Sequence, residues 1–200
     1  MRQTITTNAN ISVSKKITKA KITKHDMLDL SFEEVVTITE IVDGVEKVKT
    51  LTGNYTREGK NIVHDDVKKA FNFLRSHLAI LCDQVEAQNK TFYELDDNED
   101  SLERYKVNSY SIGGSGEHEG VTLSGSRTGK TGILNLNTQF TKYEGGDNEE
   151  TYDHSIELRG IINHCNEEAL LYLDGKIAPD AQMSLDFEAA DNDLGGEEFE

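Results

Sequence analysis

The stretch LDLSFEEVVTITEIVDGVEKVKTLTGNY, residues 28–55, decides the fold of the first half of the chain. Its first part, residues 28–42, is rich in β-branched and other apolar residues, which is typical of a β-strand. Asp43-Gly44 is a strong signal for a two-residue turn, because both residue types tolerate the positive φ angles of a tight hairpin. Residues 45–55 supply the returning strand, so the stretch predicts a β-hairpin.

The segments on either side of this hairpin extend the pattern. Before it, apolar residues alternate with Lys and Thr over residues 11–24, which predicts another strand. After it, Asp65 can cap a helix that runs to about Cys82, and the apolar residues of this segment recur at spacings of three and four. They are Val67, Ala70, Phe71, Leu74, Leu78 and Leu81. The first half therefore predicts three strands followed by one amphipathic helix.

The second half repeats this order of elements after an acidic break over residues 86–103. Three strands are predicted, over residues 105–112, 121–127 and 133–143. A helix is then predicted over residues 151–174, and Gly175 occupies the position where a glycine commonly ends a helix.

We therefore expect an α+β fold with two βββα units, each an antiparallel meander covered by a long helix. The expected domains are residues 1–90, a unit with a basic N-terminal strand; residues 91–103, an acidic connection; residues 104–178, the second unit; and residues 179–200, a disordered acidic tail. Whether the two meanders join into one sheet is left open. The same order of three strands, a helix and a hairpin is also that of an OB barrel, a common fold for binding single strands.

Charge is unevenly distributed along this chain of 200 residues with a net charge of −16. Residues 1–25 carry six Lys and Arg and no acidic residue, whereas residues 179–200 carry eight Asp and Glu and no basic residue. The net charge excludes a general attraction of the whole protein to nucleic acid, so any such binding requires a local basic surface. The sequence predicts no signal peptide, no membrane span and no disulfide framework, and we expect a cytoplasmic protein.

A segment that looks like a phosphate-binding loop, residues 124–131, ends in Gly129-Lys130-Thr131. Its first glycine is misplaced, and residues 132–137 predict a strand where such a loop requires a helix. We therefore predict a hairpin turn, in which Arg127 and Lys130 remain candidates for contact with a phosphate backbone. The histidines and cysteines show no metal-binding or catalytic spacing, so we expect no cofactor, no metal and no enzymatic activity.

The basic N-terminal strand is the other candidate for nucleic-acid binding. Lys15, Lys19 and Lys21 share one face of a regular strand and would form a ridge that contacts phosphates. Tyr105, Tyr110 and Tyr143 could supply rings on which bases stack. The alternative is an edge strand whose lysines only prevent pairing with other chains.

The acidic tail contains one apolar island, residues 182–187. Its residues Gln182, Leu185 and Phe187 resemble the hexapeptide with which replication and repair proteins engage the bacterial sliding clamp. That resemblance implies a partner-binding role for these three residues. The alternative is that Leu185 and Phe187 fold back onto the body.

The body resembles a group of small uncharacterised proteins of tailed bacteriophages and prophages. The resemblance covers about residues 20–178 and rests on residues 65–82, the Gly-rich loop before residues 121–125, and residues 132–140. The acidic tail is similar to the tails of phage and bacterial single-strand-binding proteins, although it ends in Phe199-Glu200 rather than on an apolar residue. The resemblance implies a phage protein acting in a bacterial host cell, with no established catalytic residues.

These observations together predict a non-enzymatic accessory protein of phage DNA replication or recombination. Its body would bind single-stranded DNA or a replication partner, and its tail would recruit a host factor such as the sliding clamp. The alternative is a phage antagonist of a host protein, a clamp or a defence factor, acting by occupying a pocket or by acidic mimicry of DNA. The oligomeric state is not predicted.

Overall fold

The computed structural model describes residues 10–42, 45–88, 90, 92–96, 102–145 and 151–179. These residues form an α+β fold with one antiparallel sheet and a long C-terminal helix. The strands are β1 (Asn10–Ile22), β2 (Leu28–Val42), β3 (Val45–Arg57), β4 (Tyr105–Gly113), β5 (Gly120–Gly129), β6 (Gly132–Asn137) and β7 (Thr141–Lys142). The helices are α1 (Asp65–Asn72), α2 (Arg75–Leu81), α3 (Phe92–Asp96) and α5 (Ser155–Leu173), with short 3₁₀ turns η1 (Val85–Ala87) and η2 (Gly116–His118).

The described strands of both halves join into one open sheet. Its order is β3-β2-β1-β4-β5-β6, with β7 also paired to β5, so β3 and β6 lie at the edges and these strands do not close into an OB barrel. The connection between the halves is narrow, because β1 pairs with β4 only over Lys19–Lys21 and Ser109–Ser111. β2 and β3 pair in antiparallel register from Val42 and Val45 onward, as the hairpin prediction requires. Each half has strands followed by helices, but separate βββα units are not confirmed.

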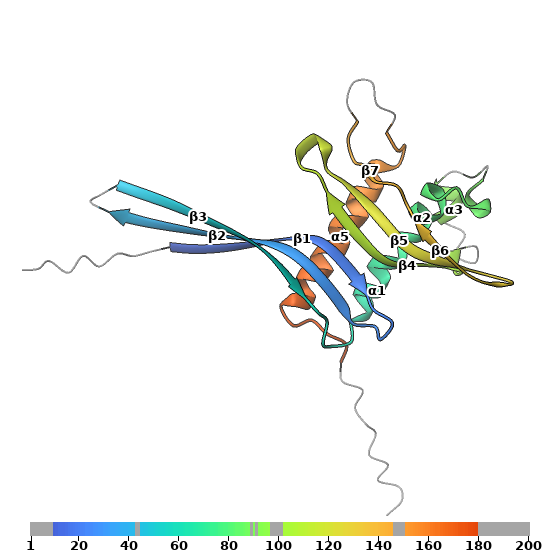
Figure 1. The fold of residues 1–200 in the computed structure, drawn as a ribbon, viewed down its shortest axis with the longest axis horizontal. Helices are drawn as coiled ribbons and strands as arrows, with labels where there is room; N and C mark the ends of the chain where they lie inside the picture. The colour runs from blue at the N-terminus through green and yellow to red at the C-terminus, as the bar shows by residue number, and fades with distance from the viewer. Residues whose placement is uncertain are drawn as a thin grey trace, which may run out of the picture.

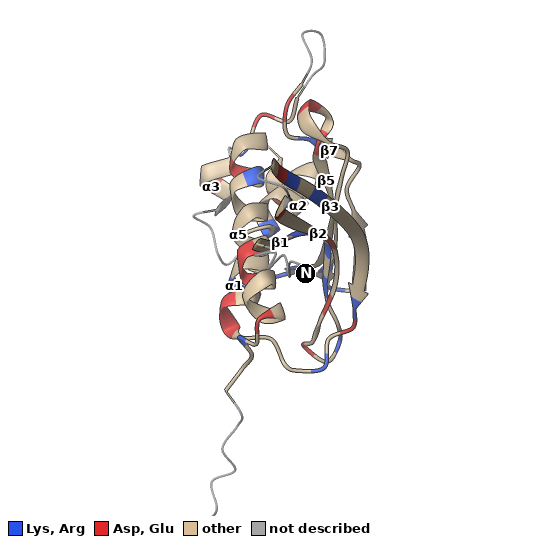
Figure 2. Cartoon of the chain, turned by 90° about the vertical axis from the view of Figure 1, so that its left-hand side faces the viewer, with Lys and Arg blue, Asp and Glu red and all other residues tan. Residues whose placement is uncertain are grey.

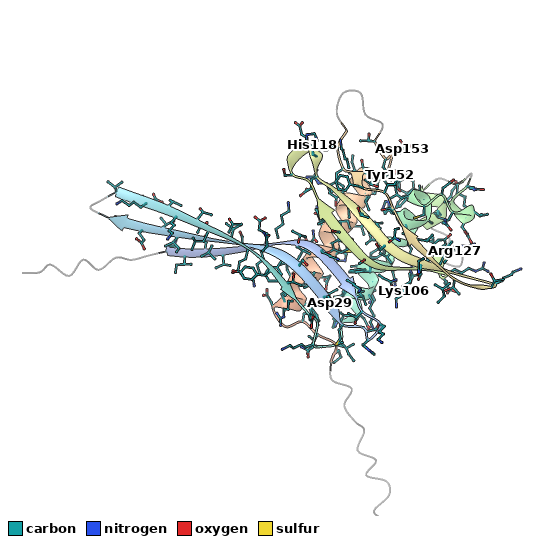
Figure 3. All side chains as sticks on the ribbon, in the orientation of Figure 1. Asp29, Lys106, His118, Arg127, Tyr152 and Asp153 are labelled. Carbon is teal, nitrogen blue, oxygen red and sulfur yellow. The ribbon has the colours of Figure 1, made fainter. Side chains whose placement is uncertain are left out.

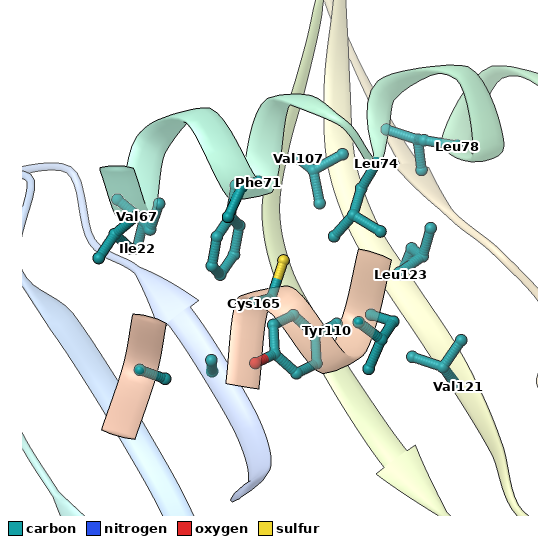
Figure 4. Close-up of a cluster of buried hydrophobic side chains, with 14 of the residues drawn as sticks. Ile22, Val67, Phe71, Leu74, Leu78, Val107, Tyr110, Val121, Leu123 and Cys165 are labelled. Carbon is teal, nitrogen blue, oxygen red and sulfur yellow. The ribbon is translucent and has the colours of Figure 1, made fainter. Parts of the chain in front are cut away.

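The helices cover one face of the sheet, and Figure 2 shows the two layers edge-on. The core lies between these layers and draws its side chains from both halves of the chain. Figure 4 shows Phe71, Leu74 and Leu78 from the first half facing Tyr110 and Leu123 of the second half. The boundary expected at residues 91–103 therefore does not divide the core.

The helix expected over residues 65–82 is present as two helices, α1 and α2, separated at Phe73 and Leu74. α1 contacts α5 and β4, whereas α2 contacts β4 and β5. Leu74 remains fully buried at the junction, whereas Phe73 is 51% exposed. Both helices therefore pack over β4, α1 on the side of α5 and α2 on the side of β5, and buried Leu74 continues the apolar stripe across the break.

The expected helix over residues 151–174 is α5, which begins at Ser155. The apolar spacing of this segment predicts a buried stripe that includes Ile156, but this side chain is 82% exposed. The buried stripe begins instead at Leu158 and continues through Ile162 and Cys165. Among the described residues, no helix is both long and apolar enough to cross a membrane.

The first three strands continue beyond the body as an arm, visible on the left of Figure 1. We define the arm as residues 10–17, 33–42 and 45–55. A register shift between Ile17 and Lys19 marks the point where β1 leaves the body for the arm. On one face of the arm, the side chains of Ile11, Val13 and Leu51 are about half exposed because no helix covers them.

Candidate nucleic-acid interface

Polar side chains predominate in the middle of the sheet on the face that carries no helix. Side chains alternate between the two faces of a strand, so the residues between the buried positions of β4 and β5 point away from the helices. In β4 these include Ser109 and Ser111, on either side of buried Tyr110, and in β5 they include Thr122 and Ser124, on either side of buried Leu123.

Strand pairing aligns these side chains into two rows that cross the sheet. The first row is Thr56, Ser31, Lys19, Ser111 and Thr122. The second row is Asp29, Lys21, Ser109, Ser124 and Asn137. We call these two rows, together with Lys106, the open polar face. It contains no aliphatic or aromatic side chain, in contrast to the core on the opposite face.

The open polar face is locally basic. Lys19 and Lys21 are both exposed on it, as predicted from the sequence for a shared face. Lys106, which pairs with Ser126 further along β4, is exposed on the same face. It is not among the residues that the sequence pattern singled out. The one carboxylate in the rows is Asp29, which accepts a hydrogen bond from the backbone N–H of Gly59 at 3.0 Å. Three lysines and one aspartate give a local charge of 3 − 1 = +2 on a protein of −16.

Such a surface has the chemistry of contact with a nucleic-acid backbone. Lysines and the hydroxyl and amide groups of Ser, Thr and Asn are the side chains that most often bind phosphate and sugar oxygens. Neighbouring strands are about 4.8 Å apart, so each row offers a polar group at short, regular intervals. Backbone contacts of this kind carry no sequence information. The arrangement therefore suits binding that does not depend on base sequence.

Three tyrosines were predicted to stack with bases, and their burial shows that this prediction is wrong. Tyr105, Tyr110 and Tyr143 are 1%, 1% and 6% exposed and lie on the helix side of the sheet. The Tyr105 hydroxyl donates to Oε2 of Glu86 at 2.6 Å, and the Tyr110 hydroxyl donates to Oδ1 of Asn166 at 2.8 Å. Burial raises the pKa of each of the three phenols above the ordinary range. Their rings pack in the core, so they present no face to a base.

Arg127 and Lys130 are not part of the open polar face. The Arg127 guanidinium points to the helix side, where it donates to the Glu86 carboxylate, including a bond from Nε at 3.1 Å. Figure 3 labels Arg127 and Lys106, which lie near the same end of the β4–β5 pair. Lys130 is exposed in the turn after β5, about 26 Å along that strand from the row that contains Lys19.

The predicted ridge of Lys15, Lys19 and Lys21 is split by the register shift after Ile17. Lys19 and Lys21 point to the open polar face, whereas Lys15 points to the other side, with its Nζ 6.0 Å from the centre of the Phe32 ring. One inserted residue in a strand moves all preceding side chains to the opposite face. Lys15 does come together with another predicted residue, Tyr143, at a small cavity where the arm leaves the body.

A larger cleft of about 900 Å³ lies between the end of α2 and the β6–β7 segment, and its wall includes Cys82 and Tyr152. Behind Tyr152 lies His77, whose Nδ1 is 2.9 Å from the Tyr152 hydroxyl. Burial, aided by the nearby charge of His154, lowers the pKa of His77 to about 3, so this side chain is neutral. Burial raises the pKa of the Cys82 thiol, which therefore is not an activated nucleophile.

Among the described residues, no group of three or more His, Cys, Asp or Glu side chains is arranged so that it could hold a metal ion. The expected partner-binding residues Gln182, Leu185 and Phe187 lie outside the described residues. No family model, curated protein or solved structure matches this chain. The resemblance to phage proteins therefore stays a prediction.

Proposed function

We propose that this protein binds single-stranded DNA through its open polar face, as a non-enzymatic accessory factor of phage DNA replication or recombination in the bacterial cytoplasm. The observation that carries the proposal is the concentration of hydroxyl, amide and lysine side chains on the helix-free face of a strongly acidic protein. A surface that served only to be solvated would not require the three lysines to be grouped there.

The shape of the face favours a flexible strand over a duplex. Reading a duplex by its grooves requires a helix or ribbon that enters them, whereas the open polar face is a broad surface of several strands. A single strand can instead follow the twisted sheet and place successive phosphates over the lysines. Because the two rows and Lys106 contain no aromatic side chain on which a base could stack, binding to them is mainly electrostatic and strongly dependent on salt.

The acidic tail has two roles in this proposal. Its island with Gln182, Leu185 and Phe187 recruits the sliding clamp or another host replication factor, which the sequence pattern alone supports. Its eight carboxylates also compete with DNA for the open polar face, because opposite charges attract at low ionic strength. A second attachment of this type increases overall affinity without a new contact in the body.

The experiment compares two variants that lose the same charge. In the first, Lys19, Lys21 and Lys106 are changed to Gln. In the control, Lys47 and Lys49 on the arm and Lys69 on α1 are changed to Gln. Binding of a fluorescent oligodeoxythymidine is followed by anisotropy over a range of salt concentrations.

Loss of three phosphate contacts should reduce the dependence of log K on log salt by about 2, at about 0.7 per contact. The control should keep the wild-type dependence. Equal losses in the two variants would contradict the proposal, because they would reflect net charge alone. If the wild type does not bind at low salt, the antagonist of a host protein becomes the leading interpretation.

A further inference from the structure

The arm leaves a long strand edge uncovered. Among the described strands, β3 pairs only with β2 and forms one edge of the sheet. Its residues are exposed from Val45 to Arg57, except for half-buried Gly53. A long edge of this kind presents a row of backbone N–H and C=O groups to which another strand can pair.

One face of the arm beside this edge is apolar, and it continues the core side of the sheet. Residues paired across neighbouring strands point to the same face, so buried Ile17 marks the side on which the helices lie. Three rows on this side are Ile17–Phe32–Tyr55, Val13–Val36–Leu51 and Ile11–Ile38–Lys49. We call them the apolar arm face. On β3 it ends in Leu51 and Tyr55, which are about half exposed.

The chain that follows α5 comes directly to this edge. Arg57, the last residue of β3, donates from Nη1 to the carbonyl oxygen of Leu173 at 3.2 Å, and Figure 1 shows this end of α5 beside β3. Ile62 pairs with Met27 on one side, and on the other its carbonyl accepts from the N–H of Ala178 at 3.0 Å. Ala178 therefore lies in the lateral position of a strand outside β3.

The direction of the chain at this point is also that of such a strand. The bridges of Met27 with Ile62 and of Val63 with Ile177 are both antiparallel. Two successive antiparallel pairings restore the original direction, so the chain at Ile177 runs parallel to β2 and towards the tip of the arm. It therefore runs antiparallel to β3, which pairs antiparallel with β2.

The residues that follow alternate as an edge strand requires. Met183, Leu185 and Phe187 are separated by single polar residues, so in an extended chain these three side chains share one face. A strand paired with β3 in this orientation would extend the apolar arm face by one strand. The intervening polar side chains would point to the opposite, polar side of the arm.

The length of the connecting chain fits this position. Met27 lies beside Ile62 and Ala178, and five residues further along β2 is Phe32, whose row contains Tyr55. Five residues separate Ala178 from Met183, and both extended spans are about 17 Å. Met183 would therefore lie opposite Tyr55. In the same register Leu185 and Phe187 would lie opposite Gly53 and Leu51.

We propose that residues 182–187 pair as an antiparallel strand with the outer edge of β3 of the same chain. Charge supports this occupant, because in the same register Asp191 of the tail lies opposite Lys47 of β3, and opposite charges across a strand pair are favourable. A second copy is a weaker candidate, since two chains of −16 repel each other. The tail is also tethered beside β3, at an effective concentration on the order of millimolar.

This pairing goes beyond the recruitment of a host factor, because it occupies the same apolar island in the protein without a partner. A host factor that binds the island would first displace it from β3. The pairing itself requires neither the sliding clamp nor DNA.

The test is amide hydrogen exchange, measured for single residues by NMR on the full chain and on a chain without residues 179–200. Pairing of β2 with β3 starts at Val42 and Val45, and hydrogen-bonded pairs then alternate along the strands. The odd-numbered residues of β3 therefore bond to β2, whereas the N–H groups of Thr52, Asn54 and Thr56 point outwards.

These three outward amides should exchange about tenfold or more slowly in the full chain than in the shortened chain. At a millimolar effective concentration, a dissociation constant of about 0.1 mM is enough for this effect. The amides of Leu51 and Gly53 face β2 and should exchange at the same rate in both chains, which makes them internal controls.

Two variants separate edge pairing from clamp recruitment. Met183→Ser removes an apolar contact with the arm and should reduce the protection of the outward amides several-fold, although Met183 is not one of the three clamp-like residues. Gln182→Ala alters one of those three residues on the polar side of the strand and should leave the protection unchanged. Each proposal can therefore fail without the other.

Equal exchange of the outward amides in the full and shortened chains would overturn the inference. Equal slowing of outward and inward amides would do the same, because it would reflect a general gain in stability. Protection that is lost on dilution, together with a dimer in sedimentation, would make a second copy the occupant of the edge and would also overturn it.

Discussion

Changing Arg127 to Ala should destabilise the fold and leave single-strand binding nearly intact. Although the sequence presents Arg127 as a candidate phosphate contact, its guanidinium binds the Glu86 carboxylate, which also accepts from the Tyr105 hydroxyl at 2.6 Å. The Arg127 and Glu86 side chains are 23% and 16% exposed, so the pair is largely but not fully buried. Glu86 lies in η1, Arg127 in β5 and Tyr105 in β4, so these contacts link η1 to both strands.

Two estimates give the magnitude. Exposed ion pairs contribute about 0–1 kcal/mol, whereas removing one partner of a buried pair costs about 3–5 kcal/mol, which places this pair near 2 kcal/mol. Independently, burial alone would raise the pKa of Glu86, but hydrogen bonds from Arg127 and Tyr105 outweigh it and lower this pKa to about 2 from an ordinary 4.5. At about 1.4 kcal/mol per tenfold change in proton affinity, the net effect of burial and the two donors favours the ionised carboxylate by about 3 kcal/mol.

The pH dependence follows from the sign of this change. The pKa of Glu86 is lower in the folded than in the unfolded state, so its contribution is fully present above pH 4.5 and is lost as the pH falls towards 2. The cost of Arg127→Ala should therefore shrink over that interval.

Urea denaturation of the wild type, Arg127→Ala and the control Lys130→Ala, measured from pH 7 to pH 3, tests this reasoning. Lys130 is exposed in a turn, and its removal should change the free energy of unfolding by less than about 0.5 kcal/mol. The reasoning is refuted if Arg127→Ala behaves like Lys130→Ala at pH 7, or if its cost is the same at pH 7 and pH 3. Weakened single-strand binding at unchanged stability would instead make Arg127 a phosphate contact.

Three further predictions concern the core, a buried histidine and the tail. Leu74→Ala and Ile162→Ala, both at fully buried positions, should each cost about 2–5 kcal/mol in chemical denaturation, whereas Ile156→Ala should cost less than about 0.5 kcal/mol. A cost below about 0.5 kcal/mol at either buried site would show that the side chain there does not pack in the core. Burial first, and then the charge of His154, lowers the pKa of His77 to about 3, so between pH 6.5 and pH 3 the unfolded state binds a proton that the folded state does not. The free energy of unfolding should therefore fall by up to about 1.4 kcal/mol for each unit by which the pH is lowered in this interval. His77→Leu should flatten this slope, and an unchanged slope would show that His77 is not responsible for it. Deleting residues 179–200 removes eight negative charges and should tighten single-strand binding, most strongly at low salt, whereas an effect that does not depend on salt would exclude electrostatic competition.

Much of the fold follows from local patterns. The apolar stripes place Leu74, Leu78 and Ile162 correctly in the core, because a two-layer fold requires each amphipathic element to bury one face. The union of the two halves could not be predicted, because it depends on the three-residue pairing of Lys19–Lys21 with Ser109–Ser111. Nothing in the local sequence of either segment specifies the other as its partner.

The candidate site was only partly predictable. Lys19 and Lys21 were identified from strand alternation, but Lys15 was assigned to the same face because one inserted residue leaves no clear signal in the sequence. The same alternation, applied to β4, could have located Lys106 and the serines beside Tyr110, and would have indicated that Tyr110 points inward. The roles of Arg127 and Tyr105 depend on Glu86, which lies in a different part of the chain.

Site-specific photo-crosslinking tests the central claim most directly, because it identifies the face of the sheet that contacts DNA. Benzoylphenylalanine is introduced at Ser111 on the open polar face, and separately at Ile156, which is 82% exposed on the helix side. Irradiation with a labelled oligodeoxythymidine at low salt should give a cross-link at position 111 that excess unlabelled strand removes, and none at position 156. Cross-linking at position 156 with none at position 111 would contradict the assignment of DNA binding to the open polar face.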